Sequence, residues 1–343
     1  MKKWNRWRSE HSSKKYDVII IGSGISGLTS GILLAQRGKK VLILEKHFKA
    51  GGWTHTFKRK NYEWDVGIHY VGQVHKKYSP ARKLFDIITN NELQWNKMDD
   101  NYDRIIFPDQ QFNFIAPRSQ FVEQMVEYFP GSKRKILEYL NQIDESVKSS
   151  QKYFGNKALP KLLSQITYMP MTNKFFKYSN KTTKEVIMNI FNDKKILGVL
   201  TGQWGDYGLP PGKSSFAMHA MVVRHYLDGA SYPIGTSRRI SETASNYLES
   251  LGGELYVNAE VDEIIVHKNK AIGVRLSSGD EINASTIISS TGVINTYKQH
   301  LRNYSDIDTL NKNLININPT GSYLCLYMGI NKSTHSLGIS NTN

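Results

Sequence analysis

The chain has 343 residues and carries 45 Lys and Arg against 30 Asp and Glu, so its net charge is +15. This length accommodates about two domains with a sizeable core, and an apolar content of 39% excludes a disordered chain. A single cysteine, Cys325, excludes an internal disulfide framework and favours a reducing compartment. The sequence has no apolar run of about 20 residues and no secretory signal. The positive charge leaves nucleic acid, an anionic membrane surface and an acidic substrate as alternative partners.

The first predicted elements form a βαβ unit. Residues 16–21 (YDVIII) make a β-branched run typical of a strand that is buried on both faces. A glycine-rich turn, an apolar helical stretch over 28–36 and a C-terminal helix glycine at Gly38 follow. Residues 40–45 (KVLILE) repeat the strand pattern. Two buried strands joined by a helix predict a parallel sheet.

A nucleotide-binding motif lies between the first strand and the helix. Gly22, Gly24 and Gly27 match G-x-G-x-x-G, in which the glycines provide a tight turn, close approach of a pyrophosphate and close helix–strand packing. The start of the helix offers free N–H groups to the phosphates. Glu45 ends the second strand, 18 residues after Gly27, where a carboxylate accepts a ribose 2′-OH and repels a 2′-phosphate. This context predicts a dinucleotide site, and both FAD and NAD use such a unit.

Two further segments favour FAD over NAD as the dinucleotide. Gly51 and Gly52 follow the second strand, where paired glycines let the backbone approach the rest of an FAD molecule. The late strand 286–292 (TIISSTG) ends in small residues, which suits a strand that returns to the cofactor at the carboxyl edge of the sheet.

The middle of the chain has a different character. Residues 76–230 are helical in patches, aromatic and basic, with a capping box from Thr182 to Glu185 and a Gly/Pro-rich loop over 202–212. Helices are predicted over 215–226 and 237–251. The segments ELYV, EIIVHK, AIGVRLSS and ASTIISSTG then predict a β-meander that feeds a final buried strand.

Together these elements predict an α/β protein. Its Rossmann-like FAD/NAD(P)-binding domain is expected to be discontinuous, with an inserted mixed α+β substrate domain. The expected boundaries are a basic N-terminal segment over 1–15, the dinucleotide-binding domain over 16–75 and 236–300, and the substrate domain over 76–235 and 301–343.

No other catalytic constellation stands out in the sequence. It lacks H-E-x-x-H, a cysteine pair and a G-x-S-x-G elbow, so no metal site is expected. The histidines are scattered, and we expect a lone helical residue such as His219 to be a satisfied or solvent-edge side chain. The alternative is that His219 or Tyr207 lines a substrate channel or donates a proton. No catalytic residue is assigned.

Three blocks of the sequence resemble a known family. Residues 16–57 are similar to the FAD-binding N-terminus of the family of retinol saturases, carotenoid isomerases and phytoene desaturases. The blocks 62–72 (YEWDVGIHYVG) and 201–233, which includes QWGDYG and FAMHA, resemble the retinol saturases in particular. The resemblance implies an FAD enzyme that saturates, desaturates or isomerises the conjugated C=C bonds of a retinoid or carotenoid. NAD or NADP is the alternative dinucleotide or an electron donor.

The resemblance also implies a set of cofactor-binding residues. They comprise the pyrophosphate loop, the ribose carboxylate with its neighbour, the paired glycines, a residue whose backbone contacts the adenine, and the end of the late strand. In this chain they are Gly22, Gly24, Ile25, Ser26, Gly27, Glu45, Lys46, Gly51, Gly52, Val261, Ser290 and Gly292.

The chain departs from the family pattern at two places. Relatives usually have Pro-x-Gly-Gly where this chain has PIGT over 233–236, and the threonine restricts φ. Relatives also continue well past residue 343 to a segment that touches the flavin, so we expect a C-terminally truncated chain. The alternative function is therefore an inactive flavoprotein relative that only binds lipid or FAD. A flavin amine-oxidase-type enzyme is disfavoured by QWGDYG.

Two basic segments suggest a membrane partner. Residues 159–180 and 2–8 mix bulky apolar side chains with lysine or arginine, which suits a membrane interface. We expect a cytoplasmic protein that docks peripherally on an anionic membrane and takes an apolar polyene from it. The alternative is an ordinary basic surface. Nucleic acid is disfavoured because the charges form no stripe, and the oligomeric state is left open.

Overall fold

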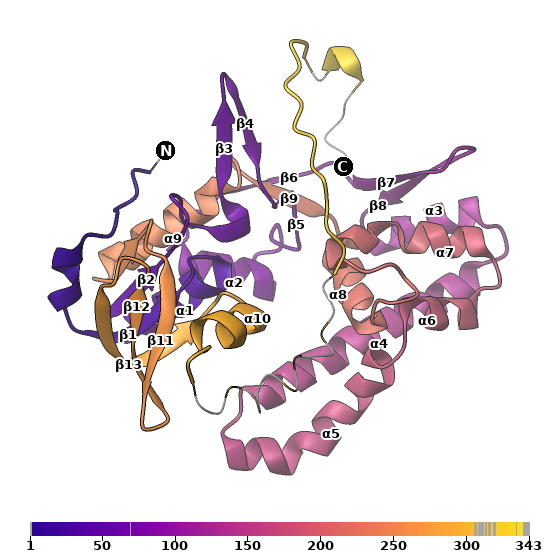
Figure 1. Ribbon diagram of the computed structural model, residues 1–343. Helices are drawn as coiled ribbons and strands as arrows, with labels where there is room; N and C mark the ends of the chain where they lie inside the picture. The colour runs from indigo at the N-terminus through magenta and orange to yellow at the C-terminus, as the bar shows by residue number, and fades with distance from the viewer. Residues whose placement is uncertain are drawn as a thin grey trace. The chain divides into compact units, whose positions relative to one another are not determined.

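The computed structural model describes residues 2–68, 70–304, 307, 312, 314, 317, 320–333 and 335–338. The chain divides into two compact units (Figure 1). The first consists of Met1–Tyr70, Lys76–Asn96 and Tyr232–Asn318, and the second of Val71–His75, Lys97–Ser231 and Pro319–Asn343. The first unit therefore includes 76–96 and 301–318, which the sequence analysis assigned to the substrate domain. The assignment of dinucleotide and substrate roles to two domains stays a prediction.

A six-stranded sheet forms the core of the first unit. The strand order is β10-β2-β1-β13-β12-β11. The first four strands run parallel, and β12 and β11 continue the sheet in antiparallel fashion. The strands are β1 (Tyr16–Ile21), β2 (Val41–Leu44), β10 (Glu254–Tyr256), β11 (Val261–His267), β12 (Lys270–Leu276) and β13 (Glu281–Ser289).

The predicted βαβ unit is confirmed. The side chains of β1 and β2 are almost all buried, as their β-branched and leucine-rich sequences require. Helix α1 (Ile25–Ala35) connects them and buries Leu28 and Ile32. A Cβ on Gly31 would lie 2.9 Å from the side chain of Ile43, so a small residue is needed for the helix to pack this closely on the sheet. Helix α9 (Arg238–Ser250) packs against α1.

Two details of the predicted meander are wrong. The segment ELYV does not join it, because β10 pairs in parallel with β2, with Glu254 opposite Leu42 and Tyr256 opposite Leu44. The glycines after α9 return the chain to the free edge of β2, where Leu255 becomes buried. The final strand is also not fully buried, since residues 286–290 are intermediate or exposed.

Strand β13 links the two halves of the sheet. Its first residues pair antiparallel with β12, with Asn283 opposite Gly273. From Ala284 onward it pairs in parallel with β1, up to Ser289 opposite Ile21. Figure 1 shows β11, β12 and β13 side by side in orange. The meander and the parallel sheet therefore share one continuous backbone.

The basic N-terminal segment packs on the first unit. Arg6 forms a parallel bridge with Val257, next to the end of β10. The Trp7 indole donates to Asp280 (2.8 Å) and packs edge-on against Tyr256, with 5.4 Å between the ring centroids. A short 3-10 helix, η1 (Ser9–Ser13), then leads into β1.

The remaining elements of the first unit surround the sheet. The hairpin of β3 and β4 follows the paired glycines, and α2 contacts both α1 and α9. These elements are η2 (Gly52–Thr54), β3 (Thr56–Arg59), β4 (Tyr62–Asp65), α2 (Pro80–Ile88), α10 (Val293–Asn295) and the π-helical turn η4 (Thr296–His300).

The second unit is mainly helical. The long helix α4 contacts α3, α5, α6 and α8. Its buried face carries Ile136, Tyr139, Leu140 and Ile143. The helices are α3 (Arg118–Tyr128), α4 (Lys133–Lys157), α5 (Lys161–Ser179), α6 (Thr183–Ile190), α7 (Lys194–Leu200) and α8 (Phe216–Tyr226), with strands β5 (Val71–Gly72), β7 (Asn101–Ile106) and β8 (Gln111–Ile115). Strands β6 (Trp95–Lys97) and β9 (Ala230–Pro233) lie where the chain passes from one unit to the other.

Local signals for the second unit were largely correct. Thr182 caps α6 and forms the predicted reciprocal capping box with Glu185. Helix α8 begins after Ser215, whose hydroxyl accepts from the N–H of Ala217. The stretch 202–212 was wrongly predicted to be a loop throughout, because 202–207 form the 3-10 helix η3 (Gly202–Tyr207). Gly208, with φ of +81°, ends it.

Helices that could span a bilayer were sought over the part of the chain that the structure describes. None of the helices there is both long enough and apolar enough to cross a membrane.

Candidate dinucleotide-binding site

The glycine loop is tightly closed. Gly22 continues the sheet by donating its N–H to the carbonyl of Leu44 (2.8 Å) and takes φ of +95°, a conformation that favours glycine. A Cβ on Gly27 would lie only 2.1 Å from the carbonyl oxygen of Gly22. The first and third glycines of the motif thus hold the loop directly against the start of α1.

The second glycine faces open space. Gly24 is the N-cap residue of α1, and a Cβ added there would meet no heavy atom of the described residues within 4 Å. No side chain of the described residues caps this helix. The N–H groups of its first turn, which includes Ile25 and the exposed Ser26, have no partner within the helix. Free N–H groups and the positive end of the helix dipole make this end of α1 suitable for an anion.

Glu45 sits beside the loop with some acceptor capacity left. Its Oε2 accepts from the backbone N–H of Ser23 (2.9 Å) and from the Ser23 hydroxyl (2.6 Å), and its Oε1 accepts from the N–H of His47 (2.9 Å). A carboxylate has about four acceptor positions, so one stays available on Oε1 for an external hydroxyl. The next residue, Lys46, is exposed.

The paired glycines complete a second wall. The N–H of Gly51 donates to the hydroxyl of Ser23 (3.0 Å), so Ser23 links this turn to Glu45. A Cβ on Gly52 would lie 3.1 Å from the Cα of Gly24. The structure therefore brings the two glycine turns into contact, and Gly52 leaves room at Gly24.

The late strand also ends at this loop. The N–H of Ser290 donates to the carbonyl of Ile21 (2.8 Å), and its hydroxyl lies 2.8 Å from that of Ser26. Gly292 follows with φ of +89°. Val261 is buried at the start of β11, just after Ala259, whose N–H donates to the carbonyl of Glu45 (2.9 Å). All the residues that the resemblance implied lie in the first unit, and their role as cofactor ligands stays a prediction.

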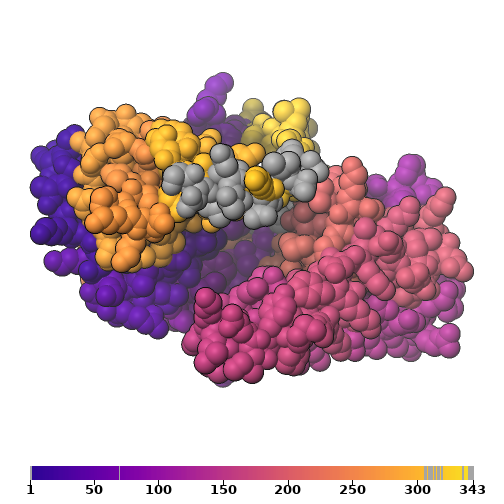
Figure 2. Space-filling view, turned by 60° about the horizontal axis from the view of Figure 1, so that its bottom comes forward, coloured from indigo at the N-terminus to yellow at the C-terminus, as the bar shows by residue number. Residues whose placement is uncertain are grey.

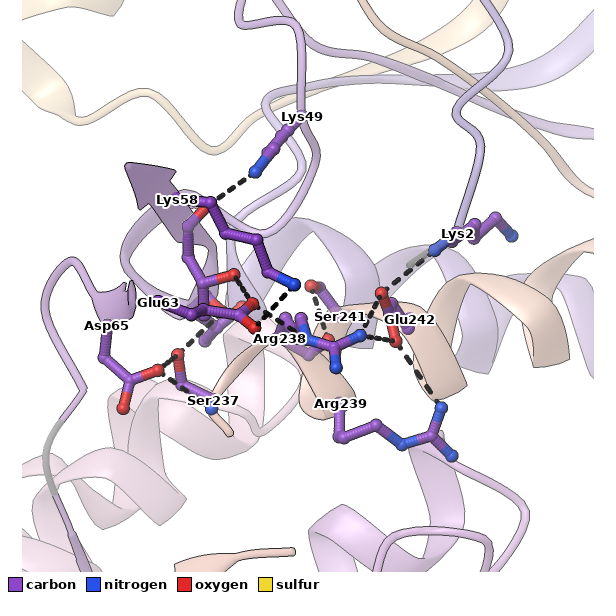
Figure 3. Close-up of polar contacts among 12 residues, drawn as sticks. Lys2, Lys49, Lys58, Glu63, Asp65, Ser237, Arg238, Arg239, Ser241 and Glu242 are labelled. Carbon is purple, nitrogen blue, oxygen red and sulfur yellow. Dashed lines mark hydrogen bonds and ion pairs between the residues drawn. The ribbon is translucent and has the colours of Figure 1, made fainter. Parts of the chain in front are cut away.

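Sequence reasoning missed a polar network that supports the paired glycines. We call it the polar clamp, and it joins the β3–β4 hairpin to the start of α9 (Figure 3). Ser237 donates its hydroxyl to Asp65 (2.7 Å) and to the carbonyl of Thr54 (3.1 Å), three residues after Gly51. Its members are Glu63, Asp65, Ser237, Arg238, Arg239 and Glu242.

Arginine–carboxylate pairs occupy the centre of the polar clamp. Arg238 lies between Glu63 (Nε to Oε1, 3.0 Å) and Glu242 (Nη1 to Oε1, 3.1 Å). The carboxylate of Glu242 also accepts the backbone N–H of Lys2 (3.0 Å). Burial by itself raises the pKa of Glu242, but the Lys2 N–H and the charge of Arg238 outweigh burial and hold it below its ordinary value. The clamp joins two distant chain segments, 63–65 and 237–242, and no short motif signals it.

The PIGT loop over 233–236, where relatives usually have Pro-x-Gly-Gly, has an unusual backbone conformation. Gly235 and Thr236 both have positive φ, +88° and +73°. A β-branched residue is rarely found in this conformation, which costs of order 1–3 kcal/mol. The threonine therefore adopts the backbone conformation that a glycine would adopt without strain, directly before Ser237 of the polar clamp.

A second polar cluster lies inside the second unit. His219 of α8 is buried, and its Nε2 lies 2.8 Å from the Tyr139 hydroxyl, while its Nδ1 lies 3.1 Å from the Tyr207 hydroxyl. Burial lowers the pKa of His219 to about 3, so the ring is neutral. Burial also raises the pKa of both tyrosines, which keeps them protonated. As predicted, His219 is a satisfied side chain; it is not at the solvent edge.

Within the described residues, no group of three or more His, Cys, Asp or Glu side chains is arranged to hold a metal ion.

A parallel sheet, a glycine loop that opens a helix and a carboxylate at the next strand end give the first unit a Rossmann-type fold. Comparison with known proteins agrees, because residues 20–88 match the NAD(P)-binding Rossmann-like domain family. A solved structure from Pyrococcus furiosus superposes with a TM-score of 0.61 at 17% identity, covering 88% of this chain and 66% of that one. Cyclohexylamine oxidase from Brevibacterium oxydans gives 0.54 at 18% identity, covering 84% and 60%.

Relatives in sequence indicate which group of proteins this chain is similar to. The chain is 32% identical to an all-trans-retinol 13,14-reductase of Danio rerio, over 95% of this chain and 56% of the relative. It is 27% identical to prolycopene isomerase 2 of an Oncidium hybrid, over 93% and 55% respectively. The chain thus spans about half the length of the curated relatives it matches. The predicted resemblance to the retinol saturase and carotenoid isomerase group is confirmed, and this chain is homologous to its members.

Proposed function

We propose that this chain belongs to an FAD-dependent oxidoreductase that acts on the conjugated C=C bonds of a retinoid or carotenoid. The reaction would be saturation, desaturation or cis–trans isomerisation. The observation that carries the proposal is the open space at Gly24, bounded by Gly52 and Glu45, in a chain homologous to a retinol reductase over 95% of its length.

The residues of the first unit fit an FAD molecule. The N–H groups at the start of α1, around Gly24, would take the pyrophosphate. The remaining acceptor position of Glu45 would take a ribose hydroxyl of the adenosine half. When bound, FAD supplies hydride transfer to or from carbon. The protein positions the dinucleotide, and the polar clamp keeps the paired glycines in place.

The partner of the reaction is proposed to be an apolar polyene. The relatives' names refer to retinol and prolycopene, two apolar molecules with conjugated double bonds. An apolar substrate requires a water-poor binding site, and we assign that role to the second unit.

The proposal is tested first by FAD binding to the purified chain. We expect a visible flavin spectrum, or one that appears when FAD is added. Glu45→Arg should weaken FAD affinity by about tenfold to a hundredfold, because a charge-assisted hydrogen bond is lost and a cation is introduced. Fluorescence titration with FAD measures this effect.

Glu123→Arg is the matched control, because it makes the same charge change at an exposed position of α3. It should leave FAD affinity unchanged. A chain that stays colourless in excess FAD would contradict the proposal, and selective binding of NADH or NADPH would instead indicate a nicotinamide-dependent enzyme.

A second experiment tests the reaction. The FAD-loaded chain is incubated with all-trans-retinol or with a poly-cis carotene under reducing conditions, and the products are separated by chromatography. A flavin-loaded chain that converts neither substrate class would favour the alternative of an inactive flavoprotein relative.

A further inference from the structure

Helix α5 exposes apolar side chains on its outer face. Leu162, Ile166 and Met169 are 69%, 68% and 61% exposed, and their spacing of four and three residues places them on one face of the helix. Leu163 is also 50% exposed. The buried residues of this helix are Thr172 and Tyr178, both in its C-terminal half. The helix therefore has bulky apolar residues where a surface helix normally has polar ones.

The end of the neighbouring helix exposes a further apolar side chain. Phe154, in the last turn of α4, is 54% exposed, and its ring lies 6.3 Å from that of Phe175 of α5. The two helices pack along each other, as the adjacent ribbons in Figure 1 show, and Figure 2 shows their surface in magenta. We call Leu162, Leu163, Ile166 and Met169 the apolar row.

Positive charge is concentrated in the segment of the sequence that contains α5. Residues 146–184 contain eight lysines and no aspartate or glutamate, so they supply more than half of the chain's net charge of +15. All eight are exposed. They are Lys148, Lys152, Lys157, Lys161, Lys174, Lys177, Lys181 and Lys184.

The lysines and the apolar row have the composition of an interfacial membrane helix. Long lysine side chains lay their methylene groups on apolar surface and keep the ammonium in the headgroup layer. The ammonium of Lys157 lies over two tyrosine rings in cation–π contacts, 5.4 Å from the ring centroid of Tyr153 and 5.3 Å from that of Tyr168. Tyrosine is itself favoured at the membrane–water boundary.

We infer that the α4–α5 surface docks on an anionic lipid bilayer. The apolar row enters the boundary between headgroups and acyl chains, and the lysines contact the anionic headgroups. A second copy of this chain fits the surface poorly, because contact through α5 would bring two lysine-rich segments of like charge together. The inference goes beyond the proposed function and does not depend on flavin binding.

The N-terminal segment 2–8 was predicted to share this role. In the structure the Trp7 indole donates a hydrogen bond to Asp280, and its ring packs against Tyr256. The inference therefore rests on α4 and α5 alone.

Vesicle flotation of the full chain tests the inference. Vesicles of phosphatidylcholine alone are compared with vesicles in which about a third of the lipid is phosphatidylglycerol. We expect strong binding to the anionic vesicles only, weakened by salt. Leu162→Ser with Ile166→Ser should reduce the partition coefficient by about tenfold or more, because two apolar side chains no longer enter the bilayer. Lys157→Glu with Lys161→Glu should have a similar effect.

Matched control variants distinguish binding through the α4–α5 surface from nonspecific adsorption to vesicles. Ile106→Ser removes an apolar side chain that is 74% exposed on β7, and Lys133→Glu with Lys194→Glu makes the same charge change at exposed positions outside 146–184. Both controls should bind like the wild type, and circular dichroism confirms folding of all variants. The inference would be overturned if the chain bound no vesicles or bound both compositions equally. It would also be overturned if the variants of the α4–α5 surface and the control variants lost binding equally. A wild-type dimer that the Leu162 and Ile166 changes make monomeric, with vesicle binding unaltered, would also overturn it.

Discussion

The glycine loop of the first unit and the Tyr139–His219–Tyr207 cluster of the second unit differ in how their polar groups are hydrogen-bonded. The loop leaves the first N–H groups of α1 without a capping side chain among the described residues, and it keeps space open at Gly24. The cluster encloses His219 and gives both of its ring nitrogens a tyrosine partner.

This difference distinguishes a binding site from a structural polar core. A site for a ligand retains hydrogen-bonding capacity that the folded chain does not use, as Glu45 retains an acceptor position. A structural cluster uses all of its capacity, because an unmet buried group costs about 1–3 kcal/mol. Substitutions in the two regions should therefore separate ligand binding from stability.

The largest effect is expected at Gly27. Gly27→Ala places a Cβ 2.1 Å from a backbone oxygen that cannot move without opening the loop. We expect a loss of about 3 kcal/mol or more in the free energy of unfolding, together with loss of dinucleotide binding. Urea denaturation followed by circular dichroism measures the first quantity.

Gly24→Ala provides the contrast within the same loop. Its Cβ enters open space, and φ of −60° suits any residue, so stability should change by less than about 0.5 kcal/mol. FAD affinity should nevertheless fall, because the methyl group occupies the space proposed for the pyrophosphate. Equal stability losses in the two alanine variants would refute this description of the loop.

The second unit should be sensitive to acid through His219. The unfolded histidine protonates near its ordinary pKa of about 6.5, whereas the buried one has a pKa of about 3. Between these pH values the unfolded state binds more protons, so the free energy of unfolding falls as the pH falls. We expect a loss of roughly 2 kcal/mol from this group between pH 7 and pH 5.

His219→Leu removes the titrating group and should flatten this dependence, although it lowers stability at pH 7 because the Tyr139 and Tyr207 hydroxyls each lose a ring nitrogen as hydrogen-bond partner. Denaturation of both proteins at several pH values compares the slopes. Parallel slopes would show that His219 is not the buried neutral group described.

A smaller loss of stability than at Gly27 is expected in the polar clamp. Glu242→Gln should cost about 1–2 kcal/mol, since this carboxylate is only 8% exposed and binds Arg238, Arg239 and the N–H of Lys2. Glu249→Gln, on the same helix, breaks only a pair with Lys2 at a site 36% exposed and should cost under about 0.5 kcal/mol. Thermal unfolding detects the difference, and identical midpoints would contradict a supporting role for the clamp.

Local signals in the sequence predicted the first unit well. The run over 16–21 and the three spaced glycines act through neighbouring residues, so pattern and structure agree, and the same holds for the Thr182 capping box of the second unit. The polar clamp and the His219 cluster join residues far apart in the chain; Tyr139 and His219 are 80 positions apart. A single sequence contains no short pattern for such contacts. Helix α5 was predicted only as a mixed basic and apolar stretch, because apolar residues on both faces leave no periodicity to read.

Because β13 pairs with both β12 and β1, the sheet of the first unit can be completed only after β13 has been synthesised. Strand β1 is made first, but its neighbour β13 is completed only at residue 289, after the helices between 118 and 226. Those helices can fold as soon as they emerge, whereas the β-branched edge of β1 must wait. The β13 side of β1 therefore stays unpaired until residue 289 has been made, and an unpaired strand edge can pair with another chain.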